Sequence, residues 1–246
     1  MHVLGIDVGG SGIKGAPVDT ATGKLVEERF RIPTPQPITP KAVAKTIRKI
    51  TQHFHWQGPI GCGFPAVITK GNVRTAANIH KTWIGTNAQA LFRDATSCPV
   101  EVLNDADAAG LAELKFGAIR NNTGVAVLIT VGTGLGTVLF IDRTLVPNTE
   151  FGHLQMNGMI AEQYASDAVR KREDFSWKKW AKRFNEYLLY LELLLRPDLF
   201  VIGGGASKKS DKFFKHLTIT TPIIPTQLLN EAGIIGSAVA YEYRTA

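Results

Sequence analysis

The sequence predicts an α/β fold with parallel strands in its sheets, and three observations predict it. Short apolar runs typical of buried strands alternate with segments of helical periodicity along the 246 residues. Two of the strands end in glycine-rich turns and are each followed by a second apolar run, in LGIDVGGSGIKGAPVD at 4–19 and VAVLITVGTGLGTVLFID at 125–142. The hydrophobic fraction of 44% and the charged fraction of 20% are ordinary for a chain that folds around its own core.

The first glycine-rich segment predicts a β-hairpin. Residues 3–8 have the pattern of a buried strand, the glycines permit a tight reversal, and 13–18 return as the partner strand. Glycine N–H groups, the hydroxyl of Ser11 and the charge of Lys14 are suited to holding a phosphate. The spacing matches neither GxGxxG nor GxxxxGK[ST], and an ordinary hairpin turn has the same composition. This segment alone therefore leaves a phosphate site and a plain turn both open.

The second glycine-rich segment repeats the first at an offset of 123 residues. Ile6, Val8 and Gly9 correspond in this repeat to Ile129, Val131 and Gly132. Two such hairpins, each opening one half of the chain, suggest two related units that face each other across a cleft. Both turns could then bind one phosphate chain. Coincidence between two ordinary hairpins stays open.

The remaining predicted elements alternate in the same way. In the first half they are a proline-rich connector at 31–40, a helix at 41–53, a strand within 60–68, an extended segment at 72–79, and a strand and helix within 99–117. In the second half they are two helices from Glu162 to Pro197, a strand at 199–202 and a small-residue helix within 230–243.

The charge of the chain predicts an anionic partner. The net charge is +7 and the pI is near 9.4. Much of the charge lies in RKREDFSWKKWAKR at 170–183 and in SKKSDKFFKH at 207–216. Trp177 and Trp180 could stack on bases, but Trp180 belongs to a helical spacing of apolar residues, which favours a core position. The lysines and arginines themselves are open to two interpretations, a solvated face or an anion-binding surface.

The sequence carries no sign of export or membrane insertion. No run approaches the roughly 20 apolar residues that span a bilayer, and the chain enters a strand at once, so we expect a cytoplasmic protein. Cys62 and Cys98 form no CxxC pair, which argues against a disulfide framework and a structural zinc site.

Two groups of polar residues are candidate sites. Asn104 and Asp105 follow a strand where a helix begins, which is where open α/β sheets bind ligands, although both residue types are also preferred helix N-caps. A carboxylate at Asp105 could accept a proton from a hydroxyl during phosphoryl transfer. Glu150, His153 and Glu162 lack the HExxH spacing of a metal site and suit the hydroxyls of a sugar, while a backbone carbonyl could equally satisfy His153.

Six motifs in this order resemble the ROK family of sugar kinases, within the actin-like ATPase superfamily. They are DVGGSGIKG, GFPAVITKGNVRTAANI, LNDADAAGLAE, TVGTGLGTVLF, EFGH and VIGGGAS, and they span nearly the whole chain. GGGASKKSDKF and the modest length make the sequence most similar to the polyphosphate glucokinases of that family. The resemblance implies an actin-like (ribonuclease H-like) fold of two lobes, the smaller from 1–108 with a C-terminal helix at about 232–246 and the larger from 109–231.

The resemblance also implies residue roles. Asp105 is expected to be the general base, and Asp7 to lie near Mg²⁺ and contact it through water. The expected sugar ligands are Asn104, Asp105, Glu150, His153 and Glu162. The expected donor-phosphate ligands are Gly9, Gly10, Ser11, Lys14, Gly132, Thr133, Gly134 and Gly204, with Lys208, Lys209 and Lys212 as a track for a long donor. Those last lysines could also be ordinary solvated loop residues.

The resemblance implies transfer of a phosphoryl group from polyphosphate, with ATP as a second candidate donor, to the 6-hydroxyl of glucose. The alternative is an ATP-dependent ROK kinase for fructose or mannose. Sugar-responsive repressors of the family carry an N-terminal helix-turn-helix, whereas this chain begins at the phosphate hairpin, which argues against that role. Many ROK kinases have a cysteine-rich zinc motif after the GH dipeptide, but LQMNGMIAEQY has no cysteine, so no zinc is expected. We further expect a homodimer that binds neither nucleic acid nor membrane.

Overall fold

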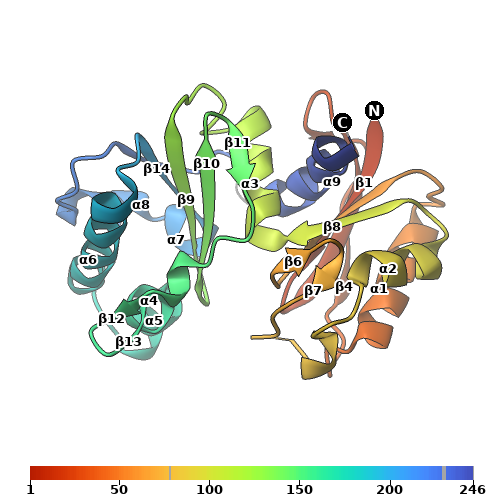
Figure 1. The fold of residues 1–246 in the computed structure, drawn as a ribbon, viewed down its shortest axis with the longest axis horizontal. Helices are drawn as coiled ribbons and strands as arrows, with labels where there is room; N and C mark the ends of the chain where they lie inside the picture. The colour runs from red at the N-terminus through yellow and green to blue at the C-terminus, as the bar shows by residue number, and fades with distance from the viewer. Residues whose placement is uncertain (78, 229–230, 246) are drawn as a thin grey trace. The chain divides into compact units, whose positions relative to one another are not determined.

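The computed structural model describes residues 1–77, 79–228 and 231–245, and its chain forms two compact units (Figure 1). Unit 1 comprises Met1–Phe116 and Asn230–Ala246, and unit 2 comprises Gly117–Leu229. The division falls at 116/117 rather than at the expected 108/109, because helix α3 (Asp105–Phe116) packs against α9 (Ala232–Thr245) and stays whole within unit 1. Residues 229, 230 and 246 of the predicted segments, and Asn78 of the predicted 72–79 segment, lie outside the described residues.

Unit 1 is built on a six-stranded mixed sheet. Its main order is β3 (Lys24–Leu25), β2 (Gly12–Asp19), β1 (His2–Val8), β5 (Ile60–Phe64) and β8 (Val100–Asn104), and β4 (Phe30–Pro33) also pairs with β2. Strands β1 and β2 form the predicted antiparallel hairpin, whereas β1, β5 and β8 run parallel. The carboxyl ends of these three strands therefore meet at one edge of the sheet, where ligands bind in α/β proteins.

Helices cover both faces of the sheet in unit 1. Helices α1 (Pro40–His53) and α2 (Ala88–Thr96) pack on the face that carries Leu4 and Ile6 in one buried cluster. Helices α3 and α9 lie on the other face, where glycine allows a close approach. A Cβ on Gly61 would collide with the carbonyl of Ser237 in α9. The remaining short elements of unit 1 are β6 (Ile68–Thr69), β7 (Asn72–Val73) and the 3₁₀ turn η1 (Lys81–Trp83).

Unit 2 is built on a five-stranded sheet in the order β11 (Thr144–Val146), β10 (Leu135–Ile141), β9 (Val125–Val131), β14 (Leu199–Gly203) and β15 (Ile223–Pro225). The antiparallel pair β9 and β10 is the predicted second hairpin, and β14 runs parallel to both β9 and β15. Helix α6 (Trp177–Leu195) buries Trp180 and Phe184 completely in the core, as its spacing predicts.

Two helices were predicted between Glu162 and Pro197, and the structure has three there: α4 (Ala161–Ala165), α5 (Asp167–Arg172) and α6. After β14 come α7 (Gly204–Ser207), α8 (Ser210–Phe213) and the 3₁₀ turn η3 (Phe214–His216), and before α4 come the 3₁₀ turn η2 (Phe151–His153) and a hairpin of β12 (Gln155–Met156) and β13 (Met159–Ile160). Ser166 separates α4 from α5 because it is extended, with φ −70° and ψ 161°, and its hydroxyl caps α5. None of the helices described combines the length and apolarity needed to cross a membrane.

Candidate active site

The predicted site residues are divided between the two units. Unit 1 carries Asp7, Gly9, Gly10, Ser11, Lys14, Asn104 and Asp105. Unit 2 carries Gly132, Thr133, Gly134, Glu150, His153, Glu162, Gly204, Lys208 and Lys209.

The turn of the first hairpin is anchored at its base and exposed at its tip. The Gly9 N–H donates to the carbonyl of Gly12 at 3.2 Å. The neighbouring β4 region contributes two further bonds, from Thr34 Oγ1 to the Gly9 carbonyl at 2.5 Å and from an Arg31 guanidinium to the Ser11 carbonyl at 2.7 Å. Gly10 is exposed, and a Cβ there would meet no atom within 4 Å. An anion can therefore approach the backbone of this turn closely.

Asp7 stands at the end of β1, opposite Lys14 in the hairpin register. Lys14 Nζ lies 3.4 Å from Asp7 Oδ2, and the Asp7 side chain is only 19% exposed. The first turn of α9 also faces this carboxylate, since a Cβ on Gly233 would lie 2.9 Å from Asp7 Cγ. The start of a helix favours a negative charge, so the Asp7 carboxylate is stabilised from two sides.

Asn104 and Asp105 join β8 to α3 at the same edge of the sheet. Asn104 Oδ1 accepts the N–H groups of Ala106 at 2.9 Å and Asp107 at 3.1 Å, and its Nδ2 donates to the Ala66 carbonyl at 3.3 Å. Asn104 is thus the N-cap of α3, and its amide nitrogen has a second hydrogen to offer a ligand.

Asp105 is half-buried, and its Oδ1 accepts the N–H of Ala106 at 2.9 Å. The adjacent strand carries Gly63 beside it, where a Cβ would stand 3.6 Å from Asp105 Cα. Strand β5 separates β1 from β8, so Asp105 and Asp7 lie two strand spacings apart, roughly 10 Å, along one edge.

The turn of the second hairpin is one residue shorter than the first. Its last strand pair is Val131 with Leu135, whereas the first hairpin closes at Val8 with Ile13, so the offset of 123 residues is lost beyond the turn glycines. The Gly132 N–H donates to the carbonyl of Gly134 at 3.1 Å. Thr133 is exposed at the tip, as Ser11 is in the first turn.

Glu150, His153 and Glu162 lie close together in unit 2. His153 Nδ1 lies 3.4 Å from Glu150 Oε2, and its Nε2 lies 3.9 Å from Glu162 Oε1. Each ring nitrogen therefore faces a carboxylate. Together the imidazole and the carboxylates can donate hydrogen bonds to, and accept them from, neighbouring hydroxyls. Burial raises the pKa of the Glu150 carboxyl, against the opposing effect of His153, and the charge of Glu162 raises it further.

The loop that carries Glu150 and His153 of this acid–histidine–acid cluster is held to β10 by hydrogen bonds of threonine hydroxyls. The Thr137 hydroxyl donates to the Thr149 carbonyl and the Thr149 hydroxyl to the Thr137 carbonyl, both at 2.8 Å. The Phe151 N–H donates to Thr137 Oγ1 at 3.0 Å. The position that a Cβ on Gly134 would take is occupied by Glu162 Oε2, so the cluster lies directly against the second turn. The loop is thus ordered by hydrogen bonds and packing.

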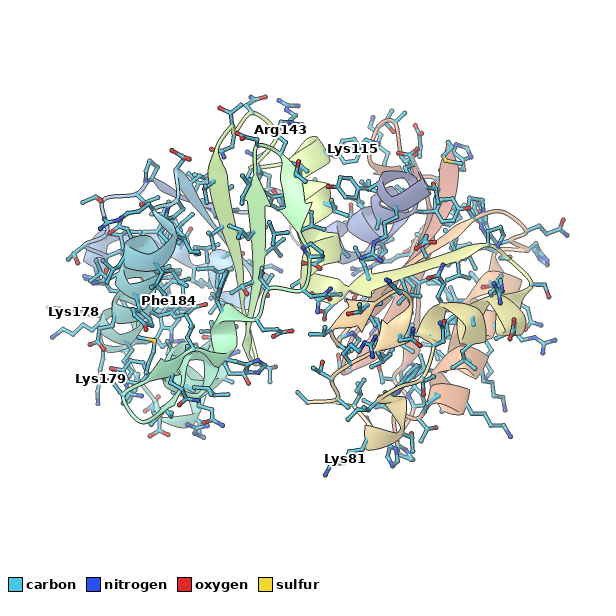
Figure 2. All side chains as sticks on the ribbon, viewed as in Figure 1. Lys81, Lys115, Arg143, Lys178, Lys179 and Phe184 are labelled. Atoms are coloured by element: carbon cyan, nitrogen blue, oxygen red, sulfur yellow. The ribbon has the colours of Figure 1, made fainter. Side chains whose placement is uncertain are left out.

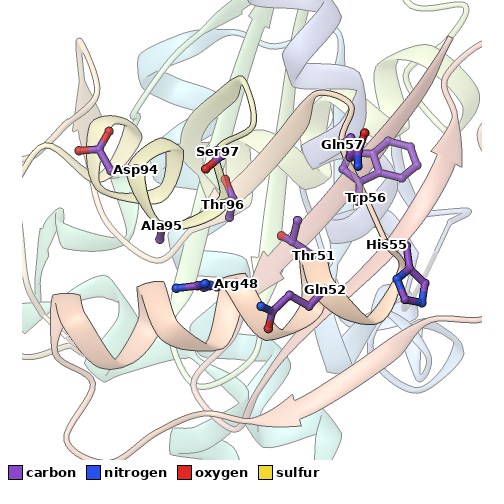
Figure 3. A pocket seen from close by; sticks show the side chains of 10 residues that line it. All are labelled: Arg48, Thr51, Gln52, His55, Trp56, Gln57, Asp94, Ala95, Thr96 and Ser97. Carbon is purple, nitrogen blue, oxygen red and sulfur yellow. The ribbon is translucent and has the colours of Figure 1, made fainter.

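A separate cavity of about 580 Å³ in unit 1 contains none of the predicted site residues (Figure 3). It lies where α1 and α2 end, and it is lined by Arg48, Thr51, Gln52, His55, Trp56, Gln57, Asp94, Ala95, Thr96 and Ser97. The carbonyl ends of both helices face it, which disfavours an anionic ligand. We therefore assign it no part in binding a phosphate donor.

Comparison with known proteins identifies the family. The model of the ROK family matches residues 3–173. This chain belongs to the ROK family. Among its relatives, the polyphosphate glucokinase of Mycobacterium tuberculosis is 50% identical over 240 residues, covering 97% of this chain and 91% of the relative. The polyphosphate glucokinase of Mycobacterium leprae is 48% identical over 238 residues, covering 96% of this chain and 74% of the relative.

Solved structures of ROK proteins confirm the predicted actin-like α/β fold. The inorganic polyphosphate/ATP-glucomannokinase of Arthrobacter sp. strain KM matches with a TM-score of 0.94 and 43% identity over 99% of both chains. A ROK glucokinase of Streptomyces griseus, solved with glucose and AMPPNP, matches with a TM-score of 0.80 and 23% identity over 97% of this chain and 98% of that one. The second match bears on the fold alone.

The candidate site also has supporting residues that the sequence did not reveal. Thr34 and Arg31 hold the first turn, and Thr137 and Thr149 hold the loop of the cluster. Only the pairing of strands brings them to the site, and no local motif marks them. Among the residues that the structure describes, no group of three or more His, Cys, Asp or Glu side chains is placed to hold a metal.

Proposed function

We propose that this chain is a glucokinase that transfers the terminal phosphoryl group of polyphosphate, with ATP as a second donor, to the 6-hydroxyl of glucose. One observation carries the proposal: polyphosphate glucokinases are 48% and 50% identical to the chain over 96% and 97% of its length. The two exposed glycine turns suit a phosphate donor, and the acid–histidine–acid cluster suits a polyhydroxy acceptor.

In the proposed reaction, the 6-hydroxyl oxygen of glucose attacks the terminal phosphorus of the donor. Asp105 takes the hydroxyl proton as the new oxygen–phosphorus bond forms. The bond from that phosphorus to the bridging oxygen breaks, and the shortened donor leaves with the electron pair. Phosphoryl transfer of this kind depends mainly on positioning and on neutralising charge, which the N–H groups of the two turns and Lys14 would supply.

The sugar would be held by Asn104, Glu150, His153 and Glu162. The free hydrogen of the Asn104 amide can donate to one hydroxyl, and the three residues of the cluster can bind others as donors and acceptors. Because the cap bonds fix the Asn104 amide, it would present this hydrogen in one orientation.

Asp7 fits the role of a Mg²⁺ ligand. Mg²⁺ commonly binds proteins through one or two carboxylates and keeps several waters and substrate phosphates as its other ligands. The single, partly exposed carboxylate of Asp7 beside the first turn suits that pattern, with Lys14 at 3.4 Å from its oxygen. When bound, Mg²⁺ would neutralise charge on the donor phosphates.

A coupled assay that measures the sugar phosphate formed tests this function. Glucose, mannose and fructose are each combined with ATP and with polyphosphate. We expect turnover of glucose with polyphosphate. Turnover with ATP but none with polyphosphate would refute the proposed donor and leave the alternative, an ATP-dependent ROK hexose kinase. A homodimer and a cytoplasmic location stay predictions, which light scattering and cell fractionation would test.

The lysines that follow Gly204 are proposed to bind the donor beyond its terminal phosphates. Lys208 and Lys209 are exposed at the junction of α7 and α8. We expect the double variant Lys208→Ser and Lys209→Ser to raise the KM for long polyphosphate by about five-fold or more, because two phosphate contacts are lost. Steady-state kinetics should show an unchanged KM for glucose. Equal losses with long polyphosphate and with tripolyphosphate would exclude these lysines from the donor track.

A further inference from the structure

The basic segment from 170 to 183 in unit 2 takes no part in the proposed reaction. Its cationic residues are Arg170, Lys171, Arg172, Lys178, Lys179, Lys182 and Arg183, against the acidic residues Glu173 and Asp174. Lys171, Lys178 and Lys179 are exposed. Figure 2 labels Lys178, whose side chain extends outward from α6, whereas Phe184 of the same helix is fully buried.

This segment begins at the second glycine turn. The N–H of Ala168, in the first turn of α5, donates to the Gly132 carbonyl at 3.0 Å. The other basic segment, 207–216, follows Gly204, which also lies against the second turn. Gly204 has φ +74°, and a Cβ there would lie 2.6 Å from the carbonyl oxygen of Val131, the residue before the turn. Both basic segments of unit 2 therefore leave from one turn, which is the turn proposed to bind the donor phosphates.

The two segments meet again at Trp177. The ring of Trp177 stacks on Phe213 of α8, with centroids 5.8 Å apart and an interplanar angle of 15°. Lys178 follows Trp177 in the chain and Lys212 precedes Phe213, so the stack brings lysine-bearing parts of α6 and α8 together. The guanidinium of Arg170 lies 4.0 Å over the Trp177 ring, which adds α5 to the same junction.

Asp167 fixes the cations of α5 in place. Its side chain is only 7% exposed, and it pairs with Arg170 at 2.7 Å and with Lys171 at 2.8 Å. Because these long side chains are already ordered, binding a ligand to them costs less conformational entropy. Two cations of the junction, Arg170 and Lys171, are therefore positioned by the fold.

We propose that this Trp177 junction, formed by Arg170, Lys171, Lys178 and Lys212, binds the distal phosphates of a long polyphosphate chain. The inference rests on the proposed function and extends its donor site. A linear polyphosphate carries negative charge along its whole length, whereas the triphosphate of ATP is short and would end near the turn. Long polyphosphate would then gain affinity from contacts that ATP and tripolyphosphate cannot reach.

The aromatic residues of the junction favour polyphosphate over single-stranded nucleic acid. Nucleic-acid surfaces of this kind stack bases on exposed rings. Here the Trp177 ring contacts Arg170 and Phe213, and the Phe175 ring contacts Lys179 at 4.1 Å and Arg183 at 4.6 Å. Both rings already serve to position cations, so the surface offers charge more than it offers stacking.

The test removes two exposed lysines of the junction, Lys171→Ser with Lys178→Ser, and leaves Arg170 to pair with Asp167. The matched control removes two exposed lysines of α1, Lys45→Ser with Lys49→Ser. We expect the junction variant to raise both the KM and the Kd for long polyphosphate about five-fold or more, with a shallower dependence on salt. The KM values for tripolyphosphate and glucose should stay within two-fold, and the control should match the wild type.

Direct binding separates this inference from the proposed function. The Kd for long polyphosphate is measured by calorimetry, without glucose, so it does not depend on turnover. An enzyme that uses polyphosphate but whose junction variant binds it as the wild type does would overturn the inference and leave the function intact. An equal loss with tripolyphosphate, an equal loss in the control, or tighter binding of single-stranded RNA than of polyphosphate at matched charge would also overturn it. A wild type that binds long polyphosphate through these lysines without turning it over would instead refute the function.

Discussion

Asp105→Asn is expected to lower kcat by about 100-fold or more while the KM for glucose changes by no more than a few-fold. The asparagine retains an oxygen that can accept the Ala106 N–H, as Asp105 does at 2.9 Å. It cannot take the proton of the 6-hydroxyl. Steady-state kinetics with saturating donor would measure both constants.

Stability provides the control for this prediction. The capping of α3 is carried by Asn104, which accepts two N–H groups, so Asp105→Asn should leave the melting temperature nearly unchanged. Asn104→Ala should instead lower the stability by about 1 kcal/mol, because it removes the cap. Near-normal turnover of the Asp105→Asn variant would mean that this carboxylate is not the general base.

The sequence predicted the elements whose signal is local. The hairpins of β1 with β2 and β9 with β10 each consist of two apolar runs around a glycine turn, and strand pairing within a hairpin depends on neighbouring residues. Helix α6 was placed correctly on its core face because Trp180 and Phe184 recur at helical spacing.

The elements that the sequence did not predict depend on distant pairing or on a single backbone conformation. Strand β15 is a three-residue edge strand that ends in Pro225, and it forms because β14 lies beside it. The break between α4 and α5 arises from one extended residue, Ser166. The first residues of the proline-rich connector belong to β4, because they pair with β2.

The same distinction applies to the candidate site. Asp105, directly after β8, was proposed as a base from its residue type and its position, whereas the role of Asp7 was implied only by the resemblance to the ROK kinases. The contact between Asp7 and Gly233 could not be predicted, because it joins the first strand to the last helix. The shorter second turn was also missed, since the repeat of Ile6, Val8 and Gly9 continues up to it without a gap.

The acid–histidine–acid cluster gives the second large expected effect. Glu150→Gln and His153→Ala should each raise the KM for glucose by a factor of about 10 to 100, because each removes a partner of a buried sugar hydroxyl. The KM for polyphosphate should change little. Glu173→Gln, which removes an exposed carboxylate elsewhere in unit 2, is the matched control for the sugar and should leave the KM for glucose at the wild-type value.

The two variants should differ in their dependence on pH. Burial raises the pKa of Glu150, so this carboxyl takes up a proton at a higher pH than an ordinary glutamate does. As the pH falls through that raised pKa, the wild type loses a charged acceptor and its KM for glucose should rise. Glu150→Gln is already neutral, so its KM should be high and should not show this rise, whereas His153→Ala retains the titrating carboxyl and should show it.

This comparison distinguishes a sugar-binding role from a structural one. Loss of loop structure would raise the KM for glucose in both variants without regard to the charge of Glu150, and the pH profile of Glu150→Gln would then follow that of the wild type. The Thr137 and Thr149 bonds that hold the loop involve neither side chain of the cluster, so both variants should keep the loop in place. An effect on the KM for polyphosphate with an unchanged KM for glucose would place the cluster at the donor and contradict its assignment to the sugar.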